Sequence, residues 1–234
     1  NNTAIGYGAL TDADTGYSNV AIGYDAGREI TTGYKCVIIG DSSGSQGSAQ
    51  TGWENIVIGW NSGYSLTSGN ANVLIGVGSG YSLNNDENNI MIGYQSGYYH
   101  TGGPNTFVGR YAGRGTTGTA SSLHNAAFGY NALQAINQGD YNVAVGSYAA
   151  DALTSGIDNT AVGYSSLGGT TTGQYNVAVG SWCLPANTTG AHNTAMGMNA
   201  LNYNTGGGGN TAIGYAALKG SAGQTGSSNT GLGT

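Results

Sequence analysis

Few side chains in this sequence could carry out acid–base, nucleophilic or metal chemistry. The histidines and cysteines stand singly and far apart: His100, His124, His192, Cys36 and Cys183. A serine–histidine–aspartate arrangement could be drawn from Ser121, His124 and an aspartate, but no nucleophile-elbow motif accompanies it. The histidines and cysteines also lack the short spacings of metal ligands. We therefore predict no catalytic residue, no cofactor and no metal site, and we predict that the protein is not an enzyme.

One glycine-rich segment, Gly206 to Gly209, could suggest a phosphate-binding loop. A phosphate loop of this type continues into lysine followed by serine or threonine, because the ammonium group must reach the phosphates. Asn210 and Thr211 follow here instead. We expect a flexible loop between repeats at this place.

The aromatic residues are more informative than the ionisable ones. The chain has 17 tyrosines and three tryptophans but only two phenylalanines. Seven rings directly follow a recurring glycine: Tyr7, Tyr24, Trp60, Tyr94, Tyr130, Tyr164 and Tyr215. This column can be a partly buried packing ladder. It can also be a set of exposed rings that bind sugars by stacking, helped by the many Asn, Ser and Thr side chains.

A repeat of 17 residues positions these rings. The string Asn2-Thr3-Ala4-Ile5-Gly6-Tyr7 returns, with small changes, along the whole chain. Its glycine, called the marker glycine below, stands at positions 6, 23, 40, 59, 76, 93, 109, 129, 146, 163, 180, 197, 214 and 233. Helix-containing repeats need roughly 20 to 47 residues, so the period is too short for them. It suits one coil of a narrow β-solenoid with two short strands and two turns.

The three residues before each marker glycine read as a short strand that is apolar on both faces. The residues one and three places before the glycine are mostly Ile, Val or Thr, and we assign their shared face to the core of the coil. The residue between them, for example Ala161, is alanine in eight copies. This alanine column must pack against either a second sheet of the same chain or a neighbouring chain, and we favour a contact between chains. The position two places after the marker, for example Ser165, varies in size and polarity, and we assign it to solvent.

Asparagine stands four places before the marker glycine in thirteen of fourteen copies, and Cys36 takes the remaining place. Stacked amides can bond to the equivalent amides in the coils above and below. We predict a structural ladder of Asn2, Asn19, Asn55, Asn72, Asn89, Asn105, Asn125, Asn142, Asn159, Asn176, Asn193, Asn210 and Asn229. We expect Asn187 to lie in an insertion. A second glycine, seven places before the marker as in Gly156, is interpreted as a turn position with positive φ.

Composition excludes several classes of protein. Charged residues are 7% of the 234 residues, and the net charge is −6. Five lysines and arginines are too few for a nucleic-acid surface. No apolar run approaches the ~18 residues of a membrane span. We predict neither a nucleic-acid partner nor membrane insertion within this segment.

These patterns predict an all-β fold in which residues 1–234 form a single array of fourteen coils. Copies two to seven mostly have glycine four places after the marker, whereas copies eight and ten to thirteen have leucine, which suggests two core fillings. Each coil has a thin core, and Cys36 and Cys183 lie eight coils apart, too far for a disulfide. Association of three chains is the remaining way to stabilise the array. Without terminal caps, the array is expected to be part of a longer fibre.

The repeat resembles two known families. Its core, Asn-[Thr/Val]-Ala-[Ile/Val]-Gly-Tyr, is similar to the YadA-like head repeats of trimeric autotransporter adhesins. It also looks like the Asn-Thr-Ala-Ile-Gly-Tyr repeats of tail-fibre-domain proteins, most clearly at residues 2–7, 159–164 and 210–215. The resemblance covers the whole chain. It implies a left-handed β-roll assembled as an obligate homotrimer on an exposed fibre.

We therefore predict the structural shaft of an extracellular fibre or adhesin, of phage tail-fibre or bacterial surface-fibre type, which displays a binding tip from a cell or virion surface. The alternative is that the solenoid itself binds glycans or ice. Ice binding would require a flat row of exposed threonines. The threonines at 3, 106, 160, 194, 211 and 230 share their column with Val and Ile, which we interpret as a buried column.

Overall fold

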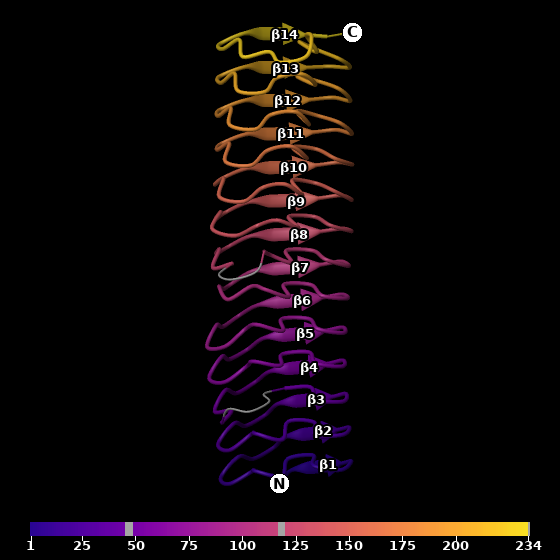
Figure 1. Cartoon of the computed structure of the whole chain (residues 1–234), viewed down its shortest axis with the longest axis vertical. Coiled ribbons are helices and arrows are strands. Elements are labelled where there is room, and N and C mark those ends of the chain that lie inside the picture. The colour runs from indigo at the N-terminus through magenta and orange to yellow at the C-terminus, as the bar shows by residue number, and fades with distance from the viewer. Residues whose placement is uncertain (45–48, 117–119, 234) are drawn as a thin grey trace. The chain divides into compact units, whose positions relative to one another are not determined.

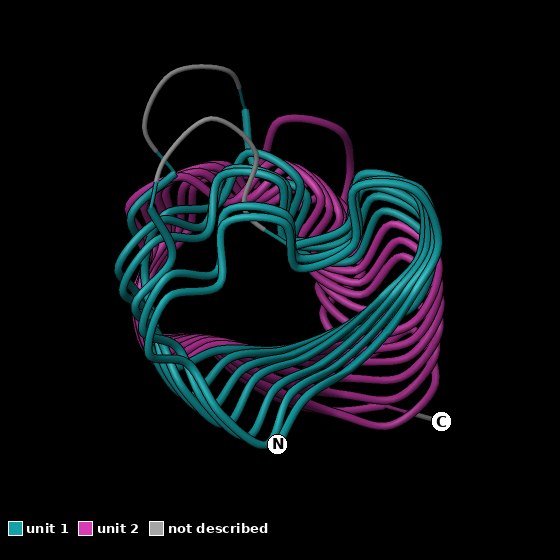
Figure 2. Ribbon diagram, turned by 90° about the horizontal axis from the view of Figure 1, so that it is seen from below, with its two compact units in different colours: residues 1–121 teal, residues 122–234 magenta. Residues whose placement is uncertain are grey.

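The computed structural model describes residues 1–44, 49–116 and 120–233. The chain divides into two compact units, unit 1 (residues 1–121) and unit 2 (residues 122–234), which are coloured separately in Figure 2. The described residues form fourteen strands of three residues each and no helix. The prediction of an all-β repeat with about 17 residues per coil is confirmed.

Each coil contributes one strand, which ends directly before its marker glycine (Figure 1). The strands of unit 1 are β1 (Thr3–Ile5), β2 (Val20–Ile22), β3 (Val37–Ile39), β4 (Ile56–Ile58), β5 (Val73–Ile75), β6 (Ile90–Ile92) and β7 (Thr106–Val108). The strands of unit 2 are β8 (Ala126–Phe128), β9 (Val143–Val145), β10 (Thr160–Val162), β11 (Val177–Val179), β12 (Thr194–Met196), β13 (Thr211–Ile213) and β14 (Thr230–Leu232).

Within each unit the strands are parallel and pair with the strands of the adjacent coils. Equivalent repeat positions face one another, so that Ala161 of β10 pairs with Ala178 of β11. This register places every residue type of the repeat in a column that runs along the unit. Viewed along the stacking direction, the coils of each unit follow nearly the same path (Figure 2).

The marker glycine is required because successive coils approach closely at this point. Gly163 has φ of 129°, which L-residues rarely adopt. A Cβ there would lie 2.6 Å from the carbonyl oxygen of Gly180 in the next coil. The same contact recurs between other marker glycines, which explains why the column tolerates no side chain.

The second glycine column has a different cause from the one that we expected. Gly156 and Gly173 are not among the residues with positive φ, so the prediction of a left-handed turn position is wrong. A Cβ at Gly173 would lie 2.6 Å from the carbonyl oxygen of Gly190. Close packing of coils therefore selects glycine here, and the carbonyl groups of the column accept hydrogen bonds from the asparagine ladder.

The wall opposite the strands is built of turns, where we had expected a second strand. Alternate residues there adopt the left-handed conformation, such as Ser165 with φ of 49° and Leu167 with φ of 53°. The backbone still bonds between coils, as in Leu167 N–H to the Cys183 carbonyl at 3.0 Å. Leucine in this conformation turns its side chain into the coil, where Leu167 is fully buried.

The two faces of the strand are the reverse of the sequence assignment. Ala161 has an exposed fraction of 0% within one chain, so the alanine column lines the core of the coil and not an interchain contact. The flanking residues point outward, and Val177 is 37% exposed. In this narrow coil the middle residue of each strand faces inward, while leucine from the opposite wall fills the remaining space. The outward flanking positions include the threonine column that we interpreted as buried.

The solvent assignment of Ser165 is also wrong, because this side chain is only 8% exposed. Its column accepts residues as different as serine and tryptophan. Trp182, at the same repeat position, is 44% exposed. The larger side chain reaches out of the coil surface while the small one stays below it, so variety in a column does not prove exposure.

Most coils of the two units fill their cores from opposite sides, while the coil of β1 in unit 1, with Ala4 and Leu10, follows the pattern of unit 2. In unit 1 the middle strand residue is large in β3 to β7, and glycine stands four places after the marker. In unit 2 the middle residue is small, and leucine mostly stands four places after the marker. The large members are Ile38, Val57, Leu74, Met91 and Phe107 in unit 1, and Leu133, Leu167, Leu184, Leu201 and Leu218 in unit 2.

Candidate functional site

The asparagine column links each coil to both of its neighbours within a unit. The Asn159 Oδ1 atom accepts hydrogen bonds from the backbone N–H of Asn176 at 3.0 Å and from its Nδ2 at 3.1 Å. The Asn159 Nδ2 donates to Asn142 Oδ1 at 3.0 Å and to the Gly173 carbonyl at 2.9 Å. Each amide therefore bonds to the coil before it and to the coil after it. The members are buried, apart from Asn2 and Asn229.

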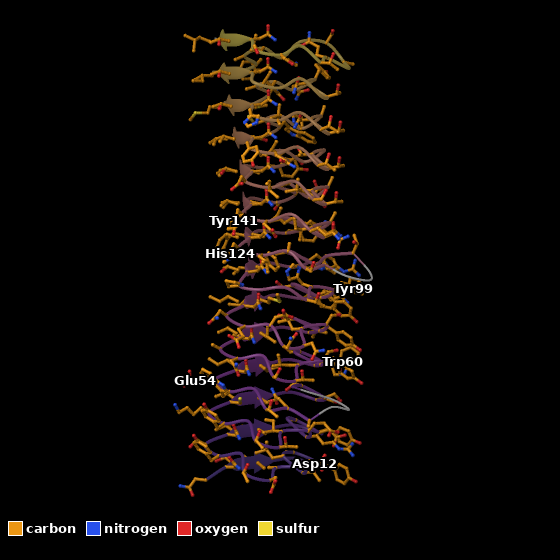
Figure 3. The ribbon with its side chains drawn as sticks, turned by 90° about the vertical axis from the view of Figure 1, so that its left-hand side faces the viewer. Asp12, Glu54, Trp60, Tyr99, His124 and Tyr141 are labelled. Atoms are coloured by element: carbon orange, nitrogen blue, oxygen red, sulfur yellow. The ribbon has the colours of Figure 1, made fainter. Side chains whose placement is uncertain are left out.

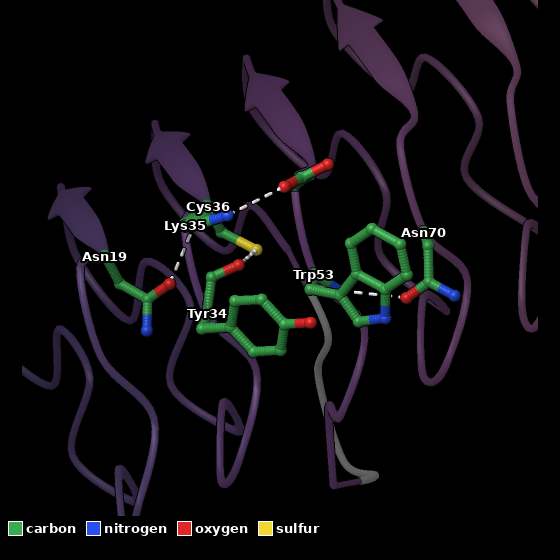
Figure 4. A network of polar contacts seen from close by, with 7 residues as sticks. Asn19, Tyr34, Lys35, Cys36, Trp53 and Asn70 are labelled. Carbon is green, nitrogen blue, oxygen red and sulfur yellow. Dashed lines mark hydrogen bonds and ion pairs between the residues drawn. The ribbon is translucent and has the colours of Figure 1, made fainter.

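Cys36 takes the place of an amide in unit 1 (Figure 4). Its backbone N–H donates to Asn19 Oδ1 at 2.9 Å, as an asparagine would. Its thiol lies 3.5 Å from the Tyr34 carbonyl and 3.6 Å from the Gly52 carbonyl. Burial raises the pKa of Cys36, although hydrogen bonds from Asn55 lower it. The thiol is thus protonated and packs as a structural side chain.

Asn187 does not lie in an insertion, as we expected, but inside the coil. It is fully buried, its Nδ2 donates to the Gly190 carbonyl at 3.0 Å, and its Oδ1 accepts from Asn204 Nδ2 at 3.3 Å. The position lies seven places after the marker glycine, where Ile136 and Leu153 fill the core in earlier coils of unit 2. The constant spacing from the marker was the signal that could have revealed this position.

The seven rings that follow marker glycines are all on the surface. Their exposed fractions run from 37% for Tyr130 to 77% for Tyr7. Tyr7 and Tyr24 stack face to face with centroids 5.5 Å apart. With Gly8, Thr11, Asp25 and Arg28 they line an open groove of about 400 Å³ in unit 1. The column thus combines ring-to-ring packing with exposure, and neither interpretation of the sequence excludes the other.

In unit 2 the rings form a row that the sequence reasoning missed. Tyr130, Tyr148, Tyr164 and Trp182 meet edge to face, with successive centroids 5.2, 6.0 and 5.4 Å apart. The rings come alternately from the first and second positions after the marker glycine, in four consecutive coils. An edge-to-face contact covers the face of only one of the two rings, so this row covers less of its ring faces by its own contacts than a stacked ladder does. The alternation was visible in the sequence.

Unit 1 stacks its other aromatic residues differently. Tyr64, Tyr81 and Tyr98 stack face to face with centroids 4.8 and 4.7 Å apart. A second ladder joins Tyr34 to Trp53 at 5.8 Å (Figure 4), and Tyr17 extends it. Rings in such ladders cover one another's faces and expose their edges. Their arrangement favours packing between coils over stacking on a sugar.

The histidines serve as packing residues. His124 stacks on Tyr141 with centroids 5.0 Å apart and the rings within 7° of parallel (Figure 3), and His192 stacks in the same way on Tyr175. His100 is fully buried, with its Nε2 2.9 Å from Asn105 Nδ2. Within the described ranges no hydrogen bond links Ser121 to His124, and no group of three His, Cys, Asp or Glu could hold a metal.

The Gly206–Gly209 segment is part of the coil. The Gly207 carbonyl accepts from Asn193 Nδ2 at 2.9 Å and from Asn204 Nδ2 at 3.0 Å. The Gly208 N–H donates to Ser227 Oγ at 3.1 Å. These bonds tie the segment to neighbouring coils, which gives its glycines a packing role.

Comparison with known proteins gives no relative. No family model matches the chain, and no curated protein or solved structure matches it significantly. In the part of the chain that the structure describes, no helix is long and apolar enough to cross a membrane.

Proposed function

We propose that this chain is the structural shaft of an extracellular trimeric fibre or adhesin, of phage tail-fibre or bacterial surface-fibre type. In this proposal it displays a binding tip from a cell or virion surface and has no enzymatic activity. The observation that carries the proposal is the outward face of the parallel sheet in each unit, which is apolar although it faces solvent in the single chain.

That face consists of the two flanking columns of the strands. Its most exposed members in the strands are Ile5, Ile56, Ile90, Phe128, Val143, Val145, Val177, Met196, Ile213 and Leu232. The column directly before the marker glycine is apolar in every coil, whereas the other flanking column includes threonines. A soluble monomer rarely presents a largely apolar strip of this kind, because its burial against another surface is favourable. A second and a third copy of the same chain would present the same strip at the same spacing. Self-association therefore matches the pattern coil by coil.

The number of three chains and the left-handed coil come from the resemblance of the repeat to trimeric adhesin heads, and both stay predictions. The structure changes the expected contact. The flanking columns, and not the alanine column, would meet between chains. Ala161→Tyr would then damage the core of the coil and not an interface.

The test is the mass of the protein in solution for two variants of the same coil. Val177→Glu places a charge on the outward face of β11, whereas Thr172→Glu places it at an exposed turn position. We expect sedimentation velocity to show a trimer for the unchanged chain and for Thr172→Glu, and smaller species for Val177→Glu. The proposal would be contradicted if the unchanged chain were a stable, folded monomer. It would also be contradicted if the Val177→Glu variant still formed a trimer.

A second candidate function, binding of glycans by the solenoid, is favoured by the edge-to-face row in unit 2. Sugar rings stack on aromatic faces, and Tyr164 and Trp182 of this row are 46% and 44% exposed. The experiment is to follow the fluorescence of Trp182 in a Trp53→Phe/Trp60→Phe variant, in which it is the one remaining tryptophan, during titration with cello- and malto-oligosaccharides. Tyr164→Ala in the same background is the binding-deficient variant. Saturable quenching that Tyr164→Ala abolishes would support it, and unchanged fluorescence would refute it.

Ice binding receives less support than glycan binding. The outward column of unit 2 reads Ala126, Val143, Thr160, Val177, Thr194, Thr211 and Thr230, so alanine and valine interrupt the threonines. A surface that orders ice would need the hydroxyl groups at regular intervals. Thermal hysteresis measured in the presence of ice crystals would test the ice-binding hypothesis.

A further inference from the structure

One column of unit 2 carries exposed side chains in five successive coils. It stands five places before the marker glycine and reads His124, Tyr141, Asp158, Tyr175 and His192. All five residues have a left-handed backbone, with φ between 54° and 60°. Because the backbone is alike at every level, the five side chains leave their coils in the same direction. An aspartate therefore occupies the middle level of a column that is otherwise aromatic.

The rings on each side of this aspartate stack in pairs. His124 lies in the coil before Tyr141 and stacks on it with centroids 5.0 Å apart (Figure 3). His192 lies in the coil after Tyr175 and stacks on it with centroids 4.8 Å apart. Each tyrosine thus has one face against an imidazole ring, and its other face is turned towards the level of Asp158. Tyr141 is 55% exposed and Tyr175 is 44% exposed.

The spacing of the coils leaves the thickness of one planar group between the two tyrosines. Strands of adjacent coils lie ~4.8 Å apart, so the centres of the Tyr141 and Tyr175 rings, two coils apart, are separated by about 9.6 Å. A planar group midway lies ~4.8 Å from each centre, which matches the centroid separation in the two histidine–tyrosine stacks. The aspartate side chain is shorter than a tyrosine, so its carboxylate lies at the base of this space. We call Tyr141, Asp158 and Tyr175 the tyrosine–aspartate slot.

The carboxylate of Asp158 has no partner of its own within the described residues. The ion pairs found there involve Asp25, Glu29 and Glu54, and no side-chain hydrogen bond reaches Asp158. Residues 122–234 contain three aspartates and one lysine, Lys219, which lies in the coil of β13, three coils away. The slot therefore attracts cations and repels anions.

A guanidinium group meets both requirements of the slot. It is planar and cationic, it stacks on aromatic faces, and its parallel N–H groups match the two oxygens of a carboxylate. An ammonium group has the charge but no plane to place between two rings. A neutral aromatic ring has the thickness, but it would cover the carboxylate without pairing it, which is unfavourable.

We propose that the tyrosine–aspartate slot binds the guanidinium group of an arginine side chain from a partner protein. Asp158 accepts two of its N–H groups, while Tyr141 and Tyr175 stack on its two faces. This inference goes beyond the shaft function, because it gives the side of the solenoid an attachment point for another protein. The slot lies outside the flanking columns of the strands, so the proposal is independent of the number of chains.

The test uses two capped peptides whose one charge is on the side chain, acetyl-Gly-Arg-Gly-amide and acetyl-Gly-Lys-Gly-amide. Saturation-transfer NMR titrations of the full chain give their dissociation constants. We expect the arginine peptide to bind at least threefold more tightly than the lysine peptide. Asp158→Asn keeps the shape of the side chain and removes its charge, and it should weaken binding of the arginine peptide by about tenfold or more. Asp12→Asn removes the same charge from an exposed position of unit 1 and should change the affinity by less than about twofold.

Equal losses in the two aspartate variants would reduce the binding to general attraction by an acidic chain and would overturn the proposal. Equal affinity for the lysine peptide would show that the planar shape has no role, and it would overturn the proposal as well. The absence of saturable binding of the arginine peptide would do the same.

Asp158→Tyr fills the slot from within the chain. The left-handed backbone holds tyrosine at the same position in both adjacent coils, so the variant should fold. We expect binding of the arginine peptide to be lost, while the thermal unfolding temperature stays the same or rises because the new ring continues the stack. Binding that persists in this variant would place the peptide elsewhere on the chain and would overturn the proposed site.

Discussion

The two units of this chain build the same coil with the large residues on opposite walls. In the coil of β5, Leu74 comes from the strand and Gly80 leaves room for it on the opposite wall. A Cβ at Gly80 would lie only 2.7 Å from Leu74 Cδ2. In the coil of β11, Ala178 comes from the strand and Leu184 comes from the opposite wall, and both are fully buried. Both coils have one large residue, and the wall that supplies it changes.

Most coils combine one large and one small residue at these two positions, whereas the coils of β2 and β9 have small residues at both, Ala21 with Gly27 and Ala144 with Ala150. Close packing of the interior leaves neither a void nor space for two large residues at the same level. The repeat can therefore vary at each position as long as its partner compensates. The comparison also makes definite predictions. A destabilising change in one unit should be compensated by a second change that introduces the pair of residues found in the other unit.

The largest effect is expected from emptying the core of unit 2. Leu184→Ala should lower the free energy of unfolding by ~2–5 kcal/mol, because it removes a buried side chain and leaves a cavity. Adding Ala178→Leu imports the filling used in unit 1 and should restore most of the loss. Urea unfolding of the single and the double variant measures the loss of stability and its recovery. A double variant that is no more stable than Leu184→Ala would show that the walls are not interchangeable.

The converse change overfills unit 1. Gly80→Leu should cost ~1–3 kcal/mol through overpacking against Leu74. The left-handed backbone admits leucine, since Leu184 has φ of 53° at the same repeat position, but a side chain at Gly80 adds backbone strain to the overpacking. Leu74→Ala should rescue the variant, and a double-mutant cycle from thermal unfolding would give the coupling. If the losses in unfolding free energy of Gly80→Leu and Leu74→Ala simply added in the double variant, the two positions would not compensate for each other's volume.

Replacing Asn159 or Asn187, two buried asparagines of unit 2, should lower the free energy of unfolding by different amounts. Both losses should exceed that from replacing an exposed asparagine. Asn159→Leu should cost ~1–3 kcal/mol, because neighbouring coils lose partners for buried groups. Asn187→Leu should cost less, since Asn187 makes fewer bonds and leucine fits a position that holds Leu153 in an earlier coil. Asn85→Leu, at an exposed position of unit 1, serves as the control. An Asn187→Leu loss that equals that of Asn159→Leu would show that the ladder has no special weight.

The smallest effect concerns the thiols, one in each unit. Burial raises the pKa of Cys183 from 9.0 to about 12. The unfolded chain then loses the thiol proton before the folded chain does, so this contribution to stability is complete below pH 9 and falls as the pH rises towards 12. Cys183→Ala should show a weaker decline between pH 8 and about 10.5 in thermal unfolding. Alanine suits the site, because Ala200 and Ala217 occupy the same column in unit 2. Identical declines would exclude the thiol as a cause.

Much of the fold could be predicted from residue spacing. The marker glycines located every strand to the residue, because the close approach of coils forbids a side chain at each of them. The asparagine positions followed from the same spacing. Asn159 and Asn176 indeed bond to each other, since parallel pairing in register brings equivalent residues together.

The direction of the side chains could not be predicted. The sequence shows that a strand is apolar on both faces, but residue size does not tell which face is inside. Val177 is larger than Ala178 and yet points outward, because Leu184 from the opposite wall supplies the missing volume. Similarly, the row that contains Tyr148 and Trp182 depends on two adjacent columns and was missed when one column was considered at a time.

The asparagine bonds run along the stacking direction within each unit, and so do the hydrogen bonds between strands. A pulling force applied along that direction would separate one coil from the next and would not slide strands past each other. The coils of a single chain should therefore detach one after another. Most would release 17 residues, roughly 60 Å of extended chain. Force spectroscopy of the single chain would show the repeat as a series of steps of similar length.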